Sequence, residues 1–269
     1  MNQLSKYPWL NWYVSNLKSI PGATYRFGFT KDQTRAASRI TMSPFRMGAT
    51  PVTWGMWKEY CKAETVRMPY KPEWGYSDDH PVVNVSWEDI MKSGGFCEWA
   101  SGVAGFKLTL PTDAQWEYAA RGGKDGLQYP WGNDFDDSKL WCSRELGVIS
   151  RTARIVDGNV RIYRSGYGLV DTTAPVDRTN RIYRNGYGLT DMVGNVWQWC
   201  ADYYNDDYRP NGKDPVDTRE SKYYQRCIRG GSWYTLTPDN FRCATRIGSL
   251  PDIRYNLNDI GFRLSAGQK

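Results

Sequence analysis

The C-terminal stretch constrains the fold most, because two rigid anchors bracket a segment without regular periodicity. The first anchor, 226–233, contains a Gly-Gly pair that permits positive φ angles, followed by a tryptophan with a large apolar body. The second anchor, 260–264, alternates apolar residues with Gly261 and Arg263, which is the period-2 pattern of a half-buried strand. The sequence therefore predicts a fixed frame that holds residues 234–259 as an ordered loop.

This segment, 234–259, also lacks five residue types altogether. It contains no Lys, Glu, Gln, Met or Trp, although the whole chain has 7 Met and 13 Trp. Its apolar residues follow neither a helical nor a strand period, so the pattern does not assign them to the core. Apolar groups exposed on a rigid frame are typical of a binding patch, and a mixture of Tyr, Asn, Ser, Thr and Gly is typical of adaptable recognition surfaces.

Helix and strand signals earlier in the chain favour an α+β fold. Residues 86–89 (Ser-Trp-Glu-Asp) and 112–115 (Thr-Asp-Ala-Gln) are capping boxes, which start two short helices. The glycine pair 94–95 should weaken or kink the first of these helices. Val82, Val83 and Val85 predict one short strand, and Leu108-Thr-Leu-Pro111 predicts another. Because loops separate these elements and no βαβ alternation is present, we expect α+β.

The aromatic composition predicts a core rich in loops and hydrogen bonds. The chain has 13 Trp and 19 Tyr against 8 Phe, and the polar tips of buried Trp and Tyr need partners. No linker-like run divides the chain, so we expect one domain, 1–269, with 226–264 as its C-terminal variable ligand-binding region. Within it, 161–171 recurs as 181–191, which we interpret as a local duplication or as paired hairpins, since two copies make no solenoid.

Charge and hydropathy exclude several classes of partner. The net charge is +6 without a long run of like charges, which indicates a solvated, mildly basic surface and not nucleic-acid binding. No stretch approaches the roughly 18 apolar residues of a membrane span. Residues 1–9 lack a signal pattern. We therefore expect a monomer that reaches a membrane only through an anchor outside this chain.

The metal-binding residue types are sparse. Six cysteines form no CxxC pair, so buried thiols are the expected state, and Cys227 and Cys243, which flank the Gly-Gly-Ser-Trp element, are the one pair to test for a bridge. His80 is the only histidine, which rules out a three-histidine iron or zinc site within this chain. We expect His80 to be structural and assign no metal ligand.

Seven motifs follow one another across residues 50–264: Pro51-Val-Thr53, His80-Pro-Val-Val-Asn-Val-Ser-Trp-Glu-Asp89, Leu110-Pro-Thr-Asp-Ala-Gln-Trp-Glu-Tyr-Ala-Ala-Arg-Gly-Gly123, Tyr129-Pro-Trp-Gly-Asn133, Gly188-Leu-Thr-Asp-Met-Val-Gly-Asn-Val-Trp-Gln-Trp199, Arg229-Gly-Gly-Ser-Trp233 and Ile260-Gly-Phe-Arg263. In content and order they resemble the formylglycine-generating enzyme, or sulfatase-modifying factor, domain family. The resemblance implies a C-type-lectin-like fold, with two short helices, short twisted antiparallel sheets and long ordered loops.

The resemblance also implies where an enzyme of this family would carry its chemistry. In the enzymes, a cysteine lies two residues after the aromatic of Gly-Gly-Ser-aromatic, a second follows five residues later, and the pair binds copper. Here these positions hold Thr235 and Asn240, and neither side chain supplies the soft thiolate that copper(I) requires. Cys243 matches a different, structural cysteine of the family. We therefore expect no catalytic residue and no enzyme.

A calcium site is the one cofactor that the resemblance leaves open. Family members supply oxygen ligands from a Gly-Asn-Val-Trp-Glu-Trp motif, including its glutamate. Here the glutamate is replaced by Gln198, which offers one neutral carbonyl oxygen, while Asn195 remains. Calcium at Asn195 and Gln198 and an uncharged hydrogen-bonded turn are both compatible with this motif.

A non-enzymatic branch of the family resembles this chain more closely: the variable proteins of diversity-generating retroelements, treponemal variable proteins in particular. These proteins diversify at adenines of AAC-type codons near the 3′ end of the gene, and NNC codons cannot encode Lys, Glu, Gln, Met or Trp. Those are the five types that 234–259 lacks. The candidate ligand-binding residues are the NNC-reachable positions between fixed frame residues: Tyr234, Thr235, Leu236, Asn240, Phe241, Ile247, Gly248, Ser249, Leu250, Ile253, Tyr255, Asn256, Leu257, Asn258 and Asp259.

The sequence thus predicts a non-catalytic, receptor-like protein whose C-terminal surface binds varied macromolecules, with protein favoured over glycan. By resemblance, the expected location is the cell surface or outside the cell. Two alternatives stay open: an oxygen-dependent enzyme of the formylglycine-generating type with a changed site, and a structural relative without a ligand.

Overall fold

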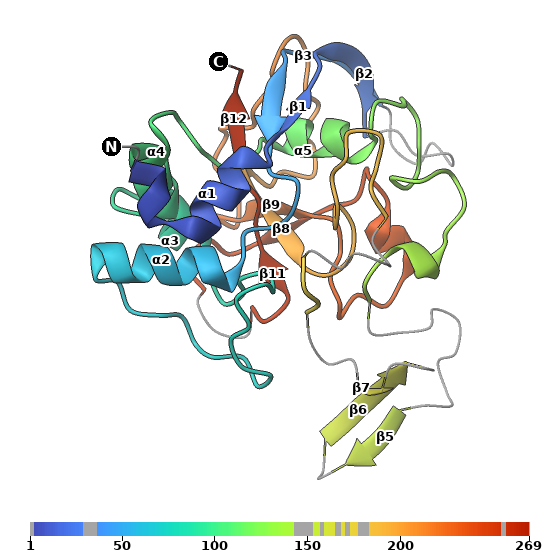
Figure 1. Ribbon diagram of the computed structural model, residues 1–269. Helices are drawn as coiled ribbons and strands as arrows, with labels where there is room; N and C mark the ends of the chain where they lie inside the picture. Colours follow the sequence, from blue (N-terminus) through green and yellow to red (C-terminus); the bar gives the residue numbers. More distant parts are fainter. Residues whose placement is uncertain are drawn as a thin grey trace.

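The computed structural model describes residues 3–28, 37–142, 153–156, 159–164, 168–169, 173–176, 183–253 and 257–268. A central four-stranded sheet lies between two groups of helices, and both chain ends lie on the same side of the molecule (Figure 1). In the described chain, no helix is both long and apolar enough to cross a membrane.

The helices begin where the capping signals predict, but the described chain has more than the two expected. Ser86 and Thr112 both form complete capping boxes. The glycine pair 94–95 splits the first predicted helix into two, as the cost of glycine inside a helix suggests. The elements are η1 (Gln3–Lys6), α1 (Pro8–Ser15), α2 (Trp54–Glu64), α3 (Trp87–Met91), α4 (Phe96–Ala104), α5 (Asp113–Ala120), η2 (Asp137–Lys139) and η3 (Pro238–Phe241).

Four short sheets carry the strands. The central one has the order β10-β9-β8-β11; the others are β1-β4-β12, β2-β3 and β5-β6-β7. Between the strands that the structure describes, every pairing is antiparallel except that of β11 with β8, which departs from the expected antiparallel sheets. The strands are β1 (Lys18–Ile20), β2 (Ala23–Phe27), β3 (Ser38–Met42), β4 (Phe45–Met47), β5 (Ala153–Val156), β6 (Asn159–Arg164), β7 (Gly168–Leu169), β8 (Trp197–Tyr203), β9 (Arg226–Arg229), β10 (Arg246–Ser249), β11 (Ile260–Gly261) and β12 (Ser265–Gly267).

Two predicted strands are wrong. Neither 82–85 nor 108–111 forms part of a described strand: the single bridge of Thr53 with Pro81 adjoins the first, and the second contains only the bridge of the half-buried Thr109 with Ser265. Their backbone groups instead bond to separate loops; the Val82 N–H, for example, donates to the Val52 carbonyl. An apolar run therefore marked burial correctly but not strand pairing.

The central sheet is covered on both faces, because side chains alternate along β8 and β9. Trp199 and Ile228 belong to one hydrophobic cluster, which contains residues of α1 to α4. Cys200 and Cys227 belong to the other, which contains residues of α5. This arrangement places α5 directly behind the start of the C-terminal segment (Figure 1).

The two copies of the internal repeat differ in structure. In the first copy, β6 and β7 form a hairpin in which Tyr163 pairs with Leu169. The described part of the second copy, 183–191, contains no strand; it forms a turn in which the Gly188 N–H donates to the Asn185 carbonyl. The paired-hairpin interpretation therefore fits only the first copy.

Candidate ligand-binding surface

The Gly-Gly pair after β9 is required by the backbone that it adopts. Gly230 and Gly231 both have positive φ, +99° and +70°. A Cβ on Gly230 would lie 2.6 Å from the Met192 carbonyl oxygen, and one on Gly231 would lie 2.6 Å from the Phe241 ring. Only glycine satisfies both the dihedral angle and the close approach, so this turn is a fixed start for the C-terminal segment.

A buried ion network holds the end of β9. The fully buried Arg229 guanidinium pairs with Asp113 and with Glu117, the latter at 3.1 Å, and donates to the Cys243 and Thr245 carbonyls. Burial alone would raise the pKa of Asp113, but the neighbouring Arg229 and Arg246 guanidiniums hold it below its usual value. The anchoring charges therefore come from α5, outside the C-terminal segment.

The second anchor is fixed through Arg263. Its fully buried guanidinium donates to Gln198 Oε1 at 2.6 Å and to the carbonyls of Gly48, Thr190 and Asp191. Burial lowers the pKa of Arg263 to about 10. Phe262, which lies between β11 and β12 in the second anchor, is buried in the core with 0% exposure.

The same contacts argue against the calcium site. Gln198 Oε1 already accepts hydrogen bonds from Arg263 and from the Trp116 indole N–H, so a cation there would face a guanidinium and no free lone pair. Asn195 Oδ1 accepts the Ala174 N–H, and Asn195 Nδ2 donates to the Ala174 carbonyl. These two side chains fit the uncharged hydrogen-bonded turn and do not fit a calcium ligand set.

Side-chain bonds join the two ends of the segment. Ser232 Oγ donates to Asp259 Oδ2 at 2.8 Å, and the Trp233 indole N–H donates to the Asn258 carbonyl at 3.0 Å. Burial raises the pKa of Asp259, and the Ser232 hydrogen bond opposes that shift. Residues 232–234 and 258–259, which are distant in sequence, therefore lie side by side.

Four of the candidate residues carry large apolar or aromatic side chains that face solvent: Tyr234 at 54% exposure, Leu236 at 44%, Leu250 at 41% and Ile247 at 36%. Ile247 lies on the edge strand β10, which pairs with β9. Six further candidates are half-buried, namely Asn240, Gly248, Ser249, Ile253, Asn258 and Asp259. Tyr255 and Asn256 lie outside the described residues.

Three candidates are buried, and their assignment as surface ligand contacts is wrong. Phe241 has 0% exposure, Thr235 has 6% and Leu257 has 7%. Phe241 packs over Gly231 and Phe135, and Leu257 lies in the cluster beside α1 to α4. Phe241 and Leu257 are buried by tertiary contacts, which produce no helical or strand periodicity in the sequence of an irregular segment.

The two positions at which family enzymes carry copper-binding cysteines do not fit a metal. The buried Thr235 hydroxyl oxygen accepts the Ser232 N–H at 2.8 Å, so it is committed to the turn after β9. Asn240 is half-buried in η3. The nearest cysteine in sequence, Cys243, is fully buried, and burial raises the pKa of its thiol to about 12.

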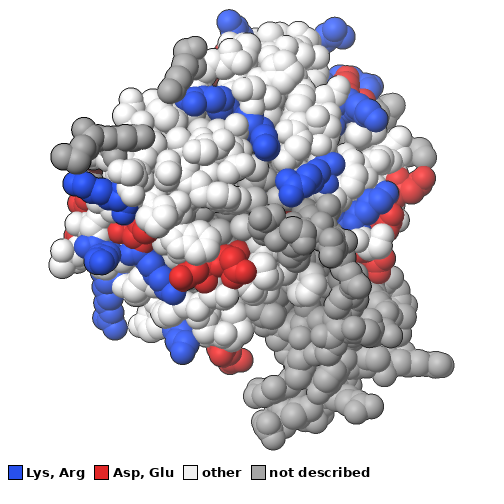
Figure 2. Space-filling view, in the orientation of Figure 1, with Lys and Arg blue, Asp and Glu red and all other residues white. Residues whose placement is uncertain are grey.

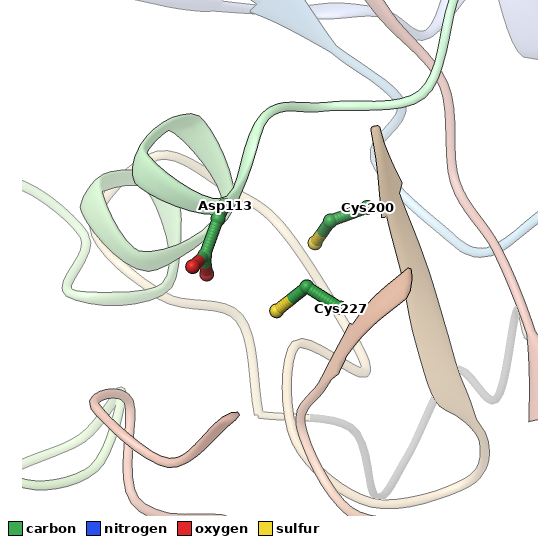
Figure 3. Close-up of side chains that lie close together, drawn as sticks. All are labelled: Asp113, Cys200 and Cys227. Atoms are coloured by element: carbon green, nitrogen blue, oxygen red, sulfur yellow. The ribbon is translucent and has the colours of Figure 1, made fainter. Parts of the chain in front are cut away.

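One group of potential metal ligands does come together elsewhere. Asp113, Cys200 and Cys227 are fully buried, and their ligand atoms lie within 4.8 Å of one another (Figure 3). Asp113, however, is already paired with the guanidiniums of Arg229 and Arg246, the latter at 2.8 Å. A cation would have to displace or oppose two positive charges, so this cluster does not fit a metal site.

All six cysteines are buried, as the sequence predicts. His80 Nδ1 forms a hydrogen bond with the Thr173 hydroxyl at 2.9 Å, which is compatible with the predicted structural role. On the face seen in Figure 2, basic and acidic side chains are interspersed.

Sequence reasoning missed the partners that support this surface. Asp113, Glu117 and Arg121 are spaced four apart on α5 and are all buried, and Arg121 pairs with Glu117 at 2.6 Å. That spacing of charges on one helix face was the available signal. Trp74, whose ring packs edge-on against Trp233 with 5.4 Å between centroids, gave no such signal.

Comparison with known proteins agrees with this geometry. The family model "Sulfatase-modifying factor enzyme 1-like domain" matches residues 13–266. The chain is 33% identical over 207 residues to the formylglycine-generating enzyme of Streptomyces coelicolor, covering 72% of this chain and 56% of the enzyme. It is also 33% identical over 215 residues to the inactive Cα-formylglycine-generating enzyme 2 of Mus musculus, covering 74% and 54%. The chain thus spans about half the length of these curated relatives.

Two solved structures share the fold. Treponema denticola variable protein 1 superposes with a TM-score of 0.69 at 20% identity, covering 94% of this chain and 95% of that one. PvdO from Pseudomonas aeruginosa superposes with a TM-score of 0.73 at 23% identity, covering 94% of each. These likenesses confirm the predicted mixed α and β, C-type-lectin-like architecture. Together with the family match, they place this chain in the formylglycine-generating enzyme, or sulfatase-modifying factor, family, which contains both active and inactive members.

Proposed function

We propose that this protein is a non-catalytic, receptor-like member of its family that binds macromolecular ligands through the exposed part of 234–259. One observation carries the proposal. Ten large apolar or aromatic side chains are exposed in the described chain, and four of them, Tyr234, Leu236, Ile247 and Leu250, fall within this one segment of 26 residues. Exposed apolar side chains lower the solubility of a protein when no ligand covers them, and they are typical of recognition sites.

The chemistry of these four residues favours a protein ligand. Leu and Ile offer neither a stacking face nor a hydrogen bond to a sugar ring, whereas a protein surface buries such aliphatic groups readily. The half-buried Asn240, Ser249 and Asn258 add donors and acceptors around them. A receptor of this kind meets its ligands outside the cell, so we also propose display at the cell surface through an anchor outside this chain, and a monomeric binding unit.

Diversification of the segment by a retroelement supplies the range of ligands. The absence of Lys, Glu, Gln, Met and Trp from 234–259 supports it, because NNC codons cannot encode these types. The burial of each position predicts how much it can vary. The exposed positions 234, 236, 247 and 250 should accept many residue types, while the buried Phe241 and Leu257 should accept only large apolar ones.

The test is deep sequencing of the 3′ end of the gene across a natural population. We expect substitutions concentrated at adenines of codons 234–259, densest at the four exposed positions. Codons 86–120, which encode buried helices of the same domain, serve as the internal control. Equal substitution rates in the two windows, or an invariant 3′ end, would refute the diversification.

The second candidate function is oxygen-dependent formylglycine formation, which draws on the active relatives at 33% identity. The assay offers a cysteine-containing sulfatase peptide with copper(I), oxygen and a thiol reductant, and measures the aldehyde product by mass. We expect no turnover, because Thr235 and Asn240 supply no thiolate. Turnover that persists in Cys243→Ser would place an active site elsewhere in the chain and overturn the non-catalytic proposal.

A further inference from the structure

Two cysteines that the proposed function does not use lie side by side on the central sheet. Trp199 of β8 pairs with Ile228 of β9 in antiparallel register. The next residue along β8 and the preceding residue of β9 are Cys200 and Cys227. The regular register ends at this point in a β-bulge, so the two cysteines are not a ladder pair, but both belong to the hydrophobic cluster on the α5 side of the sheet.

The geometry brings the two sulfur atoms within reach of each other. The Sγ atoms of Cys200 and Cys227 lie no more than 4.8 Å apart, and both side chains point toward Asp113 (Figure 3). The β-bulge between Trp199 and Tyr203 lets this part of β8 adjust locally.

We propose that Cys200 and Cys227 are a cross-strand disulfide site, which closes when the chain folds in an oxidising environment. Each thiol loses its proton and the pair gives two electrons to a disulfide oxidant such as oxidised glutathione. One protein S–S bond forms, and two molecules of reduced glutathione leave. The exchange takes place before the strands are covered, because both sulfurs are fully buried in the folded chain.

The bond would strengthen the frame of the C-terminal segment. It would link β9 covalently to β8 two residues before Arg229, which is followed by the Gly-Gly turn where the segment starts. It also closes the loop between the two cysteines, and its described residues 204–225 contain neither helix nor strand. Cross-linking such a loop removes conformational freedom mainly from the unfolded chain.

The experiment is refolding of the full chain in a glutathione redox buffer, followed by alkylation in denaturant and intact mass measurement. With six cysteines in all and two in the bond, we expect 6 − 2 = 4 alkylated thiols. Cys200→Ala and Cys227→Ala should each show five, whereas the matched control Cys61→Ala, in α2, should show three. The oxidised protein should melt roughly 5 °C or more above the reduced one.

Six alkylated thiols in the refolded wild type would overturn the proposal. So would a bond that peptide mapping assigns to any other pair, including Cys227 with Cys243. Because the thiol count and the peptide map are read on the wild type, the result does not depend on whether the alanine variants fold. Neither readout involves a ligand, so it is also independent of the proposed binding function.

Discussion

Leu257 and Leu236 carry the same side chain in the same C-terminal segment, yet one is 7% exposed and the other 44%. Substitution of each by alanine therefore compares a core position with a surface position. Leu257→Ala removes three buried carbon atoms at about 0.8 kcal/mol each and leaves a cavity, so we expect a loss of about 3 kcal/mol. Leu236→Ala should change the free energy of unfolding by less than about 0.5 kcal/mol.

The assay is urea denaturation of the wild type and both variants, with thermal melting as a second probe. For a chain of this size, a loss of about 3 kcal/mol corresponds to a Tm decrease of roughly 6–12 °C. The Leu257 carbonyl still accepts the Asn84 N–H and the Leu257 N–H still donates to Asn84 Oδ1 in the variant, so the change isolates the leucine side chain. Equal losses in the two variants, or a larger loss for Leu236→Ala, would refute the division of the segment into core and surface positions.

Two further predictions concern the buried charges near α5. Glu117→Gln leaves the Arg121 and Arg229 guanidiniums without their shared carboxylate, so we expect it to lower the free energy of unfolding, measured by urea denaturation, by about 3–5 kcal/mol. The control Glu64→Gln, at an exposed position, should leave stability unchanged, and an equally unchanged Glu117→Gln would contradict the network. Burial, and then the Asp113 charge, raise the pKa of Asp202 to about 7. Its protonated form therefore contributes fully to stability below about pH 4, and this contribution is lost as the pH rises toward 7. NMR of the Asp202 carboxyl should show a titration midpoint near pH 7, and a midpoint at the ordinary pKa of aspartate would disprove the shift.

The parts of the fold that local chemistry controls could be predicted from the sequence. Ser86 and Thr112 start helices because their hydroxyls accept N–H groups within three residues, and the glycine pair 94–95 ends one helix for an equally local reason. The first anchor was recognisable because its Gly-Gly pair marks the positive φ angles of Gly230 and Gly231. The period-2 pattern of 260–264 was misleading, because only 260–261 form a strand and Gly261 and Arg263 are buried like their apolar neighbours.

What local chemistry could not predict was burial inside the irregular segment. Phe241 is buried because Gly231, ten residues earlier, leaves room for its ring, and Leu257 because Asn84, 173 residues away, holds its backbone. Neither contact has a period or a motif. The run 82–85 failed differently: its valines are buried, but the N–H groups of Val82 and Asn84 donate to carbonyls of two separate segments, at Val52 and Leu257.

The separation of frame from surface explains how one segment can be both well ordered and open to sequence change. Asp113 and Glu117 of α5 and Gln198 of β8 help to fix its ends and lie outside 234–259, and the segment itself adds the buried Arg246, which pairs with Asp113, and Asp259, which accepts from Ser232. Exposed positions therefore contribute little to the free energy of folding. Tolerance to substitution should follow burial and not codon type, so that Phe241 limits the repertoire although its codon can vary as freely as that of Tyr234.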